Sequence, residues 1–280
     1  MTTNQLATLQ KGELKLSEID QMILEEAAAD EDAFDIIPTK ITIAPGGINV
    51  FSTSDGEAMK TLTAIIAVSQ KARAYWPEKG TGSPPLCASY DGRRGVFNTM
   101  ATDAQCKAAT GAREPHPAIP LLDANRPIPD AFPCATCPLS QWGSTHQNGV
   151  GKSKACKELR RLVIIVDGWT APALLTLPPT SIRAFDAYAS GLQQKRLSYF
   201  AVRTKITLEA KKTVNGEPYS VAAFAVDGKL ADAEQVKAVI ALRAEYKRLV
   251  GQMEIVGDEY DETDTTPPNG DGDAEPPIPF

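Results

Sequence analysis

Three cysteines in the middle of the chain have the spacing of a metal-binding turn. Cys134 and Cys137 form a Cys-x-x-Cys pair followed by proline, and Cys156 follows a loop rich in Gly, Ser, Asn and Lys. Two thiolates on one tight turn make half of a tetrahedral zinc site. We expect Cys87, in LCASYDG, to supply the fourth ligand, and a buried or redox-active pair without metal is the alternative. The other donors that remain open are Cys106, His116 and His146, the last of which would make a Cys3His site.

Enzyme chemistry fits this region poorly. The GVGKS stretch lacks the glycine that a phosphate-binding loop needs five residues before Gly151, because His146 stands there. A catalytic zinc site leaves one coordination position open and places a proton carrier nearby. The chain has no His-x-Glu or His-Glu-x-x-His, and glutamate is absent between Glu114 and Glu158. We therefore expect a structural metal and no enzymatic activity.

The cysteine count and the N-terminal residues indicate the compartment. Five cysteines, an odd number, in a chain that starts MTTNQLATLQKGELK without an export pattern indicate reduced thiols in a cytoplasm. No apolar run approaches the roughly 20 residues of a membrane span. We expect a soluble cytoplasmic protein, located in the host cytoplasm if a phage encodes it.

Charge is distributed very unevenly along the 280 residues. The net charge is -6, yet residues 41–250 carry 26 basic and 17 acidic residues, or +9. Residues 251–280 hold nine acids and no Lys or Arg, and residues 1–40 hold nine acids and three bases. A basic body between acidic ends is typical of proteins that bind nucleic acid and also recruit partners.

Hydrophobic periodicity predicts a mainly β body with flanking helices. We expect an amphipathic helix at 13–29, strands near Ile41 and over 60–76, and further strands at 162–168 and 173–177. A helix capped by Thr180 or Ser181 should bury Ile182, Phe185, Ala189 and Leu192. A hairpin turning at Asn215-Gly216 and a last helix with Val236, Val239, Ile240, Tyr246 and Leu249 on one face should follow.

In the strand over 60–76, alternation predicts two different faces. Leu62, Ala64, Ile66, Val68 and Ala72 should face one way, and Thr63, Ile65, Ser69, Lys71, Arg73 and Tyr75 the other.

Together these elements predict an α+β protein with an antiparallel barrel of the oligonucleotide-binding type. The long irregular segment at about 78–157 should be a zinc-ordered insertion within a barrel over 38–230, because so long a loop needs something other than a hydrophobic core to order it. An acidic helical segment (1–37) would precede the barrel, and a helix (231–252) and a disordered acidic tail (253–280) would follow it.

The final residues, GDGDAEPPIPF, resemble the acidic C-terminal tip of bacterial single-stranded-DNA-binding proteins. In that family the tip docks on replication, recombination and repair enzymes. The resemblance implies a partner-binding role for Pro276, Pro277, Ile278, Pro279 and Phe280. The chain departs from the family in having two prolines where acids are usual, which bears on affinity for the partner.

The stretch CATCPLSQWGS with GKSKACKELRRL resembles single-strand binders of phages and mobile elements, including the zinc-containing proteins of T-even phages. This resemblance implies a Zn²⁺ cofactor for Cys134, Cys137, Cys156 and Cys87. The T-even site includes a histidine, so the ligand set here stays open.

Sequence-independent binding of a single strand requires cations along the phosphates and flat rings on which bases stack. Basic and aromatic residues recur together on the outward faces and loops that we predict. The candidates are Lys71, Arg73, Tyr75, Trp76, Tyr90, Arg93, Arg94, Trp142, Lys152, Lys154, Arg160, Tyr199, Arg203 and Lys205.

We therefore expect a zinc-stabilised protein that coats single-stranded DNA during replication, recombination or repair and recruits DNA-processing enzymes. It could also associate with itself along the strand. The alternative is a zinc-containing regulator or adaptor that acts on duplex DNA.

Overall fold

The computed structural model describes residues 38–76, 84–97, 131–144, 154–213, 216–230, 232–251, 253 and 255. The N-terminal helix predicted at 13–29 and the acidic tail after 255 lie outside the described residues. The described strands are β1 (Thr39–Ile43), β2 (Phe51–Thr53), β3 (Ala58–Met59), β4 (Thr61–Tyr75), β5 (Cys87–Ser89), β6 (Arg94–Phe97), β7 (Phe132–Pro133), β8 (Lys157–Val166), β9 (Ala173–Leu177), β10 (Val202–Lys212) and β11 (Pro218–Lys229). The described α-helices are α4 (Pro179–Gln194) and α5 (Ala233–Leu249), and short 3-10 turns are η1 (Cys134–Thr136), η2 (Pro138–Ser140) and η3 (Tyr199–Ala201).

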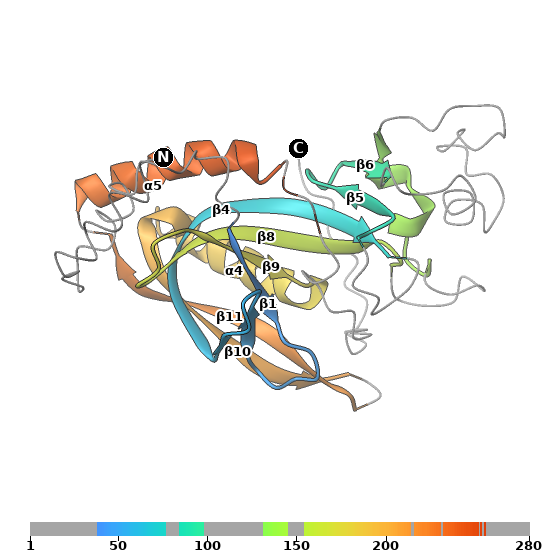
Figure 1. The fold of residues 1–280 in the computed structure, drawn as a ribbon, viewed down its shortest axis with the longest axis horizontal. Coiled ribbons are helices and arrows are strands. Elements are labelled where there is room, and N and C mark those ends of the chain that lie inside the picture. The colour runs from blue at the N-terminus through green and yellow to red at the C-terminus, as the bar shows by residue number, and fades with distance from the viewer. Residues whose placement is uncertain are drawn as a thin grey trace.

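The strands form a curled, mixed sheet that makes a half-barrel (Figure 1). Its order is β3-β2-β1-β9-β8-β4-β5-β6-β7, and β10 joins the start of β4 and carries β11 as its outer neighbour. The mainly β architecture and the late hairpin of β10 and β11 agree with the sequence. β1 pairs with β9 in parallel, so the sheet is not the purely antiparallel one that we predicted. Parallel pairing of strands so distant in sequence leaves no local signal in the chain.

A bulge divides the long strand β4 into two parts. The register against β8 shifts between Ile66 and Val68, so that Ala67 is the extra residue. Before the bulge Ile66 packs in the cluster around Phe185, and after it Val68 packs in a different cluster with Ile65 and Ala67. A bulge exchanges the faces of all later residues. Our prediction that Ser69, Lys71, Arg73 and Tyr75 lie opposite Leu62, Ala64 and Ile66 was therefore wrong, and they share that face.

Helix α4 covers the concave face of the sheet. Its Phe185, only 2% exposed, packs with Leu62, Ile164 and other buried residues of β1, β2, β4, β8, β9, β10 and β11. The predicted cap is wrong, because the N-cap is Pro178, without a side-chain bond, and Pro stands at the first helical position. Ser181 is instead fully buried, and its hydroxyl accepts a hydrogen bond from the Ala222 amide of β11.

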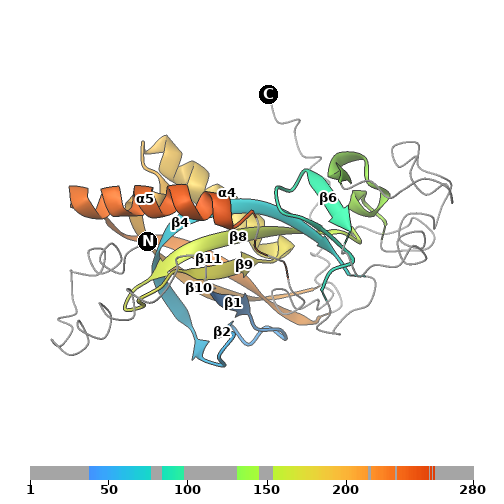
Figure 2. The same cartoon turned by 45° about the horizontal axis from the view of Figure 1, so that its top comes forward.

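Helix α5 covers the opposite face, as the two views of the ribbon show (Figures 1 and 2). Val239, Leu242 and Tyr246 pack on Ile65 and Val163. Ile240, which we expected to be buried, is 50% exposed. The N-cap of the helix is Asp232, whose side chain accepts a hydrogen bond from the Glu234 amide.

Arg161 fixes the chain that leaves α5. Its side chain is fully buried, and its Nη1 donates to the carbonyls of Val250 at 3.2 Å and Met253 at 2.8 Å. These bonds satisfy carbonyls at a helix end, where intrahelical partners run out. Two residues further, Ile255 is 2% exposed in a small cluster with Ala74 and Leu159. The last described residue therefore lies beside the end of β4.

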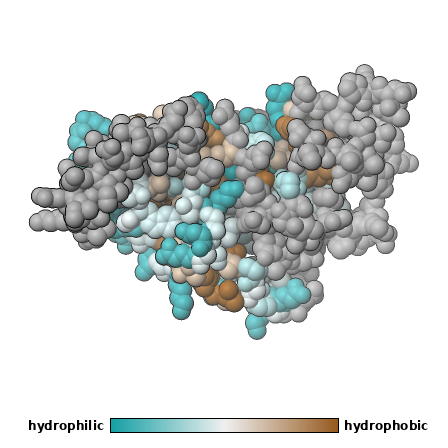
Figure 3. All heavy atoms as spheres, viewed as in Figure 1, coloured by the Kyte–Doolittle hydropathy of each residue, from teal (hydrophilic) through white to brown (hydrophobic). Residues whose placement is uncertain are grey.

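Exposed hydrophobic side chains are scattered. The large ones are Ile48, Val96, Trp142, Val226 and Ile240, each on a different element or loop. On the face seen in Figure 3, hydrophobic colour among the described atoms is confined to small separate areas. Within the described residues, neither helix has the length and apolar character needed to cross a membrane.

Candidate metal centre and nucleic-acid interface

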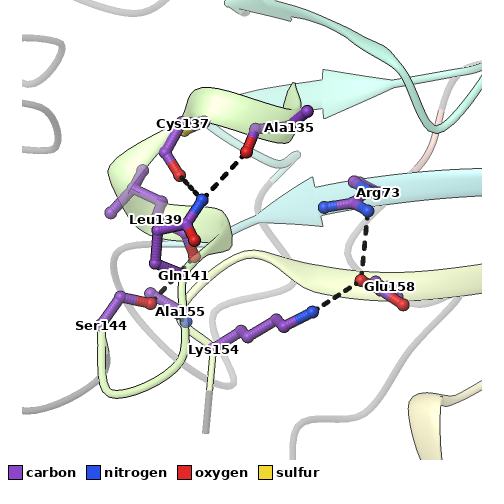
Figure 4. A network of polar contacts seen from close by, with 9 residues as sticks. All are labelled: Arg73, Ala135, Cys137, Leu139, Gln141, Ser144, Lys154, Ala155 and Glu158. Atoms are coloured by element: carbon purple, nitrogen blue, oxygen red, sulfur yellow. Dashed lines mark hydrogen bonds and ion pairs between the residues drawn. The ribbon is translucent and has the colours of Figure 1, made fainter. Parts of the chain in front are cut away.

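Two consecutive 3-10 turns present the Cys-x-x-Cys pair. In η1 and η2 the Cys137 amide donates to the Cys134 carbonyl at 3.2 Å, and the Ser140 amide donates to the Cys137 carbonyl at 3.0 Å. Gln141 lies across both turns, and its Nε2 donates to the carbonyls of Ala135 and Cys137 (Figure 4). The side-chain amide of Gln141 thus holds the two 3-10 turns together.

Backbone bonds bring the other cysteine segments to this turn. The Cys134 amide donates to the Arg93 carbonyl at 2.7 Å, and the Cys156 amide donates to the Leu139 carbonyl at 2.8 Å. Ser144 links the same two segments, because its Oγ donates to the Leu139 carbonyl and accepts from the Ala155 amide (Figure 4). The turn between β5 and β6, the two 3-10 turns and the residues just before β8 therefore meet at one place.

Four cysteines gather there, and we call Cys87, Cys134, Cys137 and Cys156 the cysteine cluster. All four are buried thiols, between 4% and 8% exposed. Cys87 and Cys137 pack together with Tyr75, Phe97 and Leu139 around them. Cys134, Cys137 and Cys156 lie close enough to influence one another electrostatically.

The surroundings of the cysteine cluster oppose and favour thiolates at once. Burial raises the pKa of Cys156 to about 12, and repulsion from Cys137 and Cys134 adds to it. Burial also raises the pKa of Cys137, whereas the amides of Leu139 and Ser140 hydrogen-bond its sulfur and act in the opposite direction. Burial raises the pKa of Cys134, whereas a hydrogen bond with the Ser89 hydroxyl and the positive charge of Arg73 lower it.

Within the described residues, no group of three or more His, Cys, Asp or Glu side chains has the arrangement of a metal-ion site. Neutral thiols pack as small hydrophobic groups, which accounts for their close packing here. Cys87, which we preferred as the fourth ligand, packs against Cys137, and its role as a ligand stays a prediction. The alternative ligands Cys106, His116 and His146 lie outside the described residues.

A row of cations lies beside the cysteine cluster, and we call Lys71, Arg73, Lys154 and Arg160 the basic strip. Lys71 pairs in register with Arg160, and Arg73 pairs with Glu158, on the concave face of β4 and β8. Arg73 Nη2 lies 3.1 Å from Glu158 Oε1, and Lys154 Nζ lies 3.0 Å from the same oxygen (Figure 4). Arg73 also contributes positive charge to three of the four thiols.

Trp142 extends this row into solvent. It is 69% exposed, and Lys154 Nζ lies 4.7 Å from the centre of its ring. An exposed tryptophan beside a row of cations can stack a base while neighbouring cations bind phosphates.

The turn between β5 and β6 presents two more cations next to Lys71. Asp91 Oδ1 accepts hydrogen bonds from the amides of Arg93 and Arg94, which leaves both arginine side chains exposed. Burial opposes the charge of Asp91, but these amides and Ser89 hold its pKa below the usual value. Gly92 has φ +72°, and a Cβ there would lie 2.9 Å from the Cβ of Lys71. Only glycine therefore lets this turn lie against β4.

Other predicted DNA-binding residues lie elsewhere or have packing contacts. Lys205 pairs with Thr63 at the opposite end of β4, and Arg203 pairs with Asp167 and Asp227. Tyr199 packs against Phe185 and accepts a hydrogen bond from Arg243. Trp76 is 9% exposed and Tyr90 packs beside it, while Tyr75 contacts Cys87. Lys152 and Pro276 to Phe280 lie outside the described residues.

The sequence reasoning missed three residues of this region. Asp91 and Gly92 form an Asp-Gly pair between short strands, a turn signal that was readable in the sequence. Glu158 could not be recognised, because its importance depends on the register of β8 against β4.

Comparison with known proteins found no relative: no family model matches the chain, and no curated protein or solved structure matches it.

Proposed function

We propose that this protein binds single-stranded DNA without strong sequence preference, on the concave end of the sheet where the basic strip adjoins Trp142. The observation that carries the proposal is the continuous row of contacts from Trp142 through Lys154 and Glu158 to Arg73. An exposed aromatic ring and a series of spaced cations are the two features that such binding requires. The positive charge of the body supports the same function.

A zinc ion held by the cysteine cluster belongs to this proposal. The amides that hydrogen-bond Cys137 and the Ser89 hydroxyl near Cys134 would stabilise thiolate ligands. Zinc requires the thiols to lose their protons and to rearrange into a tetrahedron, so its binding would release protons. The metal would fix the insertion that carries Trp142 and would hold Arg93 through the Cys134 amide.

Recruitment of DNA-processing enzymes through Pro276 to Phe280 rests on the sequence alone. An apolar tip with nearby acids suits a pocket with a basic rim. Deleting these five residues should leave DNA affinity at least as high as in the full chain and abolish partner recruitment.

The decisive experiment is a fluorescence-anisotropy titration of labelled oligo-dT and of a duplex of the same length, at two salt concentrations, with zinc measured in the same preparation. We expect tight binding of the single strand that weakens steeply with salt, and one zinc per chain. Preference for duplex would favour the regulator or adaptor, and absence of binding to either would refute the proposal.

Single substitutions place the site. Lys71→Ala should reduce the slope of log affinity against log salt by about 0.7, the value for one phosphate contact on a single strand. The matched control is Lys211→Ala, which removes the same charge from the far part of the hairpin. Equal effects of the two substitutions would show that general charge, and not the basic strip, determines binding.

A further inference from the structure

Glu158 has an unusual position for a carboxylate in a site proposed to bind phosphates. It stands on β8 within the concave face, and one of its oxygens, Oε1, accepts from both Arg73 and Lys154 (Figure 4). Lys71 contributes further positive charge to the same carboxylate, which acts with Lys154 and Arg73 to lower its pKa against the effect of burial. An anionic oxygen that collects two cations has the contacts that a phosphate oxygen would make.

We propose that Glu158 occupies the place of a DNA phosphate in the free protein and is displaced from Arg73 and Lys154 when a single strand binds. This inference rests on the function proposed above. Glu158 then sets how tightly the strand is held, because each bound phosphate must compete with a carboxylate already in place.

The exposure of the three side chains permits this exchange. Glu158 is 40% exposed, and Arg73 and Lys154 are 21% and 23% exposed, so solvent and ligand can reach all three side chains. Ion pairs at such positions contribute little to stability. Releasing them should therefore not unfold the region, especially since phosphates replace the lost contacts.

The neighbouring ion pair of Arg160 differs in this respect. Arg160 Nη2 lies 2.8 Å and 3.0 Å from the two oxygens of Asp186, and its guanidinium lies 5.9 Å from the ring centre of Phe185. Arg160 is 12% exposed and joins β8 to α4. The ion pair of Arg160 with Asp186 supports the fold, whereas a phosphate can replace Glu158 in its contacts with Arg73 and Lys154.

Displacement should also change the surroundings of Trp142. Lys154 lies over its ring and is bound to Glu158 at the same time. A phosphate that draws Lys154 away would alter the cation over the ring, so binding should be visible in tryptophan fluorescence. Lys154→Gln should remove most of this component of the signal.

The test compares Glu158→Gln with the wild type and with Glu209→Gln in oligo-dT titrations of the full chain. Glu209 pairs with Lys211 on β10 and loses the same charge on substitution, so it reports the general electrostatic effect. We expect Glu158→Gln to bind on the order of tenfold more tightly than Glu209→Gln. Glu158→Asp, which keeps the carboxylate, should return the affinity toward the wild-type value.

The outcomes separate the two proposals. If wild type binds oligo-dT and Glu158→Gln binds no more tightly than Glu209→Gln, the displacement of Glu158 is refuted and the proposed function stands. A Glu158→Gln protein that is weaker in binding and less stable in thermal unfolding would show that Glu158 only supports the fold, which also refutes the inference. If neither wild type nor Glu158→Gln binds, both proposals fail.

Discussion

Before the bulge at Ala67, β4 lies between two apolar clusters, whereas beyond it the same strand carries cations on one face. The first part is enclosed by α4 on the concave face and α5 on the opposite face. Among the described residues, the second part has a small cluster of alanines, Trp76, Leu159 and Ile255 on its convex face. Its concave face holds the basic strip and adjoins the cysteine cluster. One strand thus serves a core and a candidate binding site.

The difference shows what holds each part in place. In the first part the burial of large apolar side chains provides the stability, and backbone pairing follows from it. In the second part the side chains of Gln141 and Ser144 donate hydrogen bonds and the carboxylate of Asp91 accepts them, which fixes the short turns, and four thiols fill the space between these turns. We therefore expect the first part to respond to loss of volume and the second to changes in charge, protonation and metal.

The largest expected effect follows from emptying the core of the first part. Phe185→Ala should lower the free energy of unfolding by about 3–5 kcal/mol, because a large ring that is 2% exposed leaves a cavity. Chemical denaturation measures the loss. Val226→Ala, at a position 48% exposed, is the control and should change stability by less than about 0.5 kcal/mol. Similar losses for both would contradict the assignment of the main core.

Alkaline pH should destabilise the second part of the metal-free protein. The folded-state pKa of Cys156, about 12, lies above its ordinary value of 9.0, so the folded state holds this proton more tightly than the unfolded state. The resulting stability is fully present below about pH 9 and is lost as pH rises toward 12, at no more than about 1.4 kcal/mol per pH unit for this group. Denaturation at several pH values measures the slope.

A control is needed because burial also raises the pKa of Tyr246, on the buried face of α5, to about 12. Tyr246→Phe removes that contribution, and the slope that remains above pH 9 should come from the cysteine cluster and from Tyr188, whose pKa is also raised by burial. Cys156→Ser should then reduce this slope. A slope unchanged by Cys156→Ser would show that this thiol is not buried as described.

The smallest expected effect on stability belongs to the residue with the largest expected effect on DNA binding. Trp142→Ala should change the free energy of unfolding by less than about 0.5 kcal/mol, because the side chain is 69% exposed. The same substitution should weaken oligo-dT binding by about 1–3 kcal/mol, the contribution of one stacked base. A loss of stability equal to the loss of affinity would identify Trp142 as a packing residue.

The sequence predicted the elements of the first part well, because their periodicity reflects burial. Phe185, Leu192, Val239 and Tyr246 are buried as expected. The faces of β4 were wrong because Ile65, Ile66, Ala67 and Val68 are all apolar, so no alternation marks the extra residue.

In the candidate site, residue types were easier to predict than positions. We preferred Cys87 to Cys106, His116 and His146 as the fourth ligand, and the structure packs Cys87 against Cys137, while its role as a ligand stays a prediction. Arg160 and Arg161 are adjacent and chemically alike, yet Arg160 lies on the concave face and Arg161 is buried under the end of α5. Only the strand register and the path of the chain after α5 distinguish them.

The bulge adds one residue to β4, so the alternation of faces before Ala67 does not continue in the same phase after it. Deleting Ala67 would restore simple alternation and keep the pairing of Lys71 with Arg160, so the cations would stay on the concave face with Leu62 and Ile66. Deleting Ser69 or Gln70 would instead turn Lys71 and Arg73 toward the convex side, away from the cysteine cluster. The number of residues between the bulge and Lys71 therefore determines whether core and site share one face of the strand.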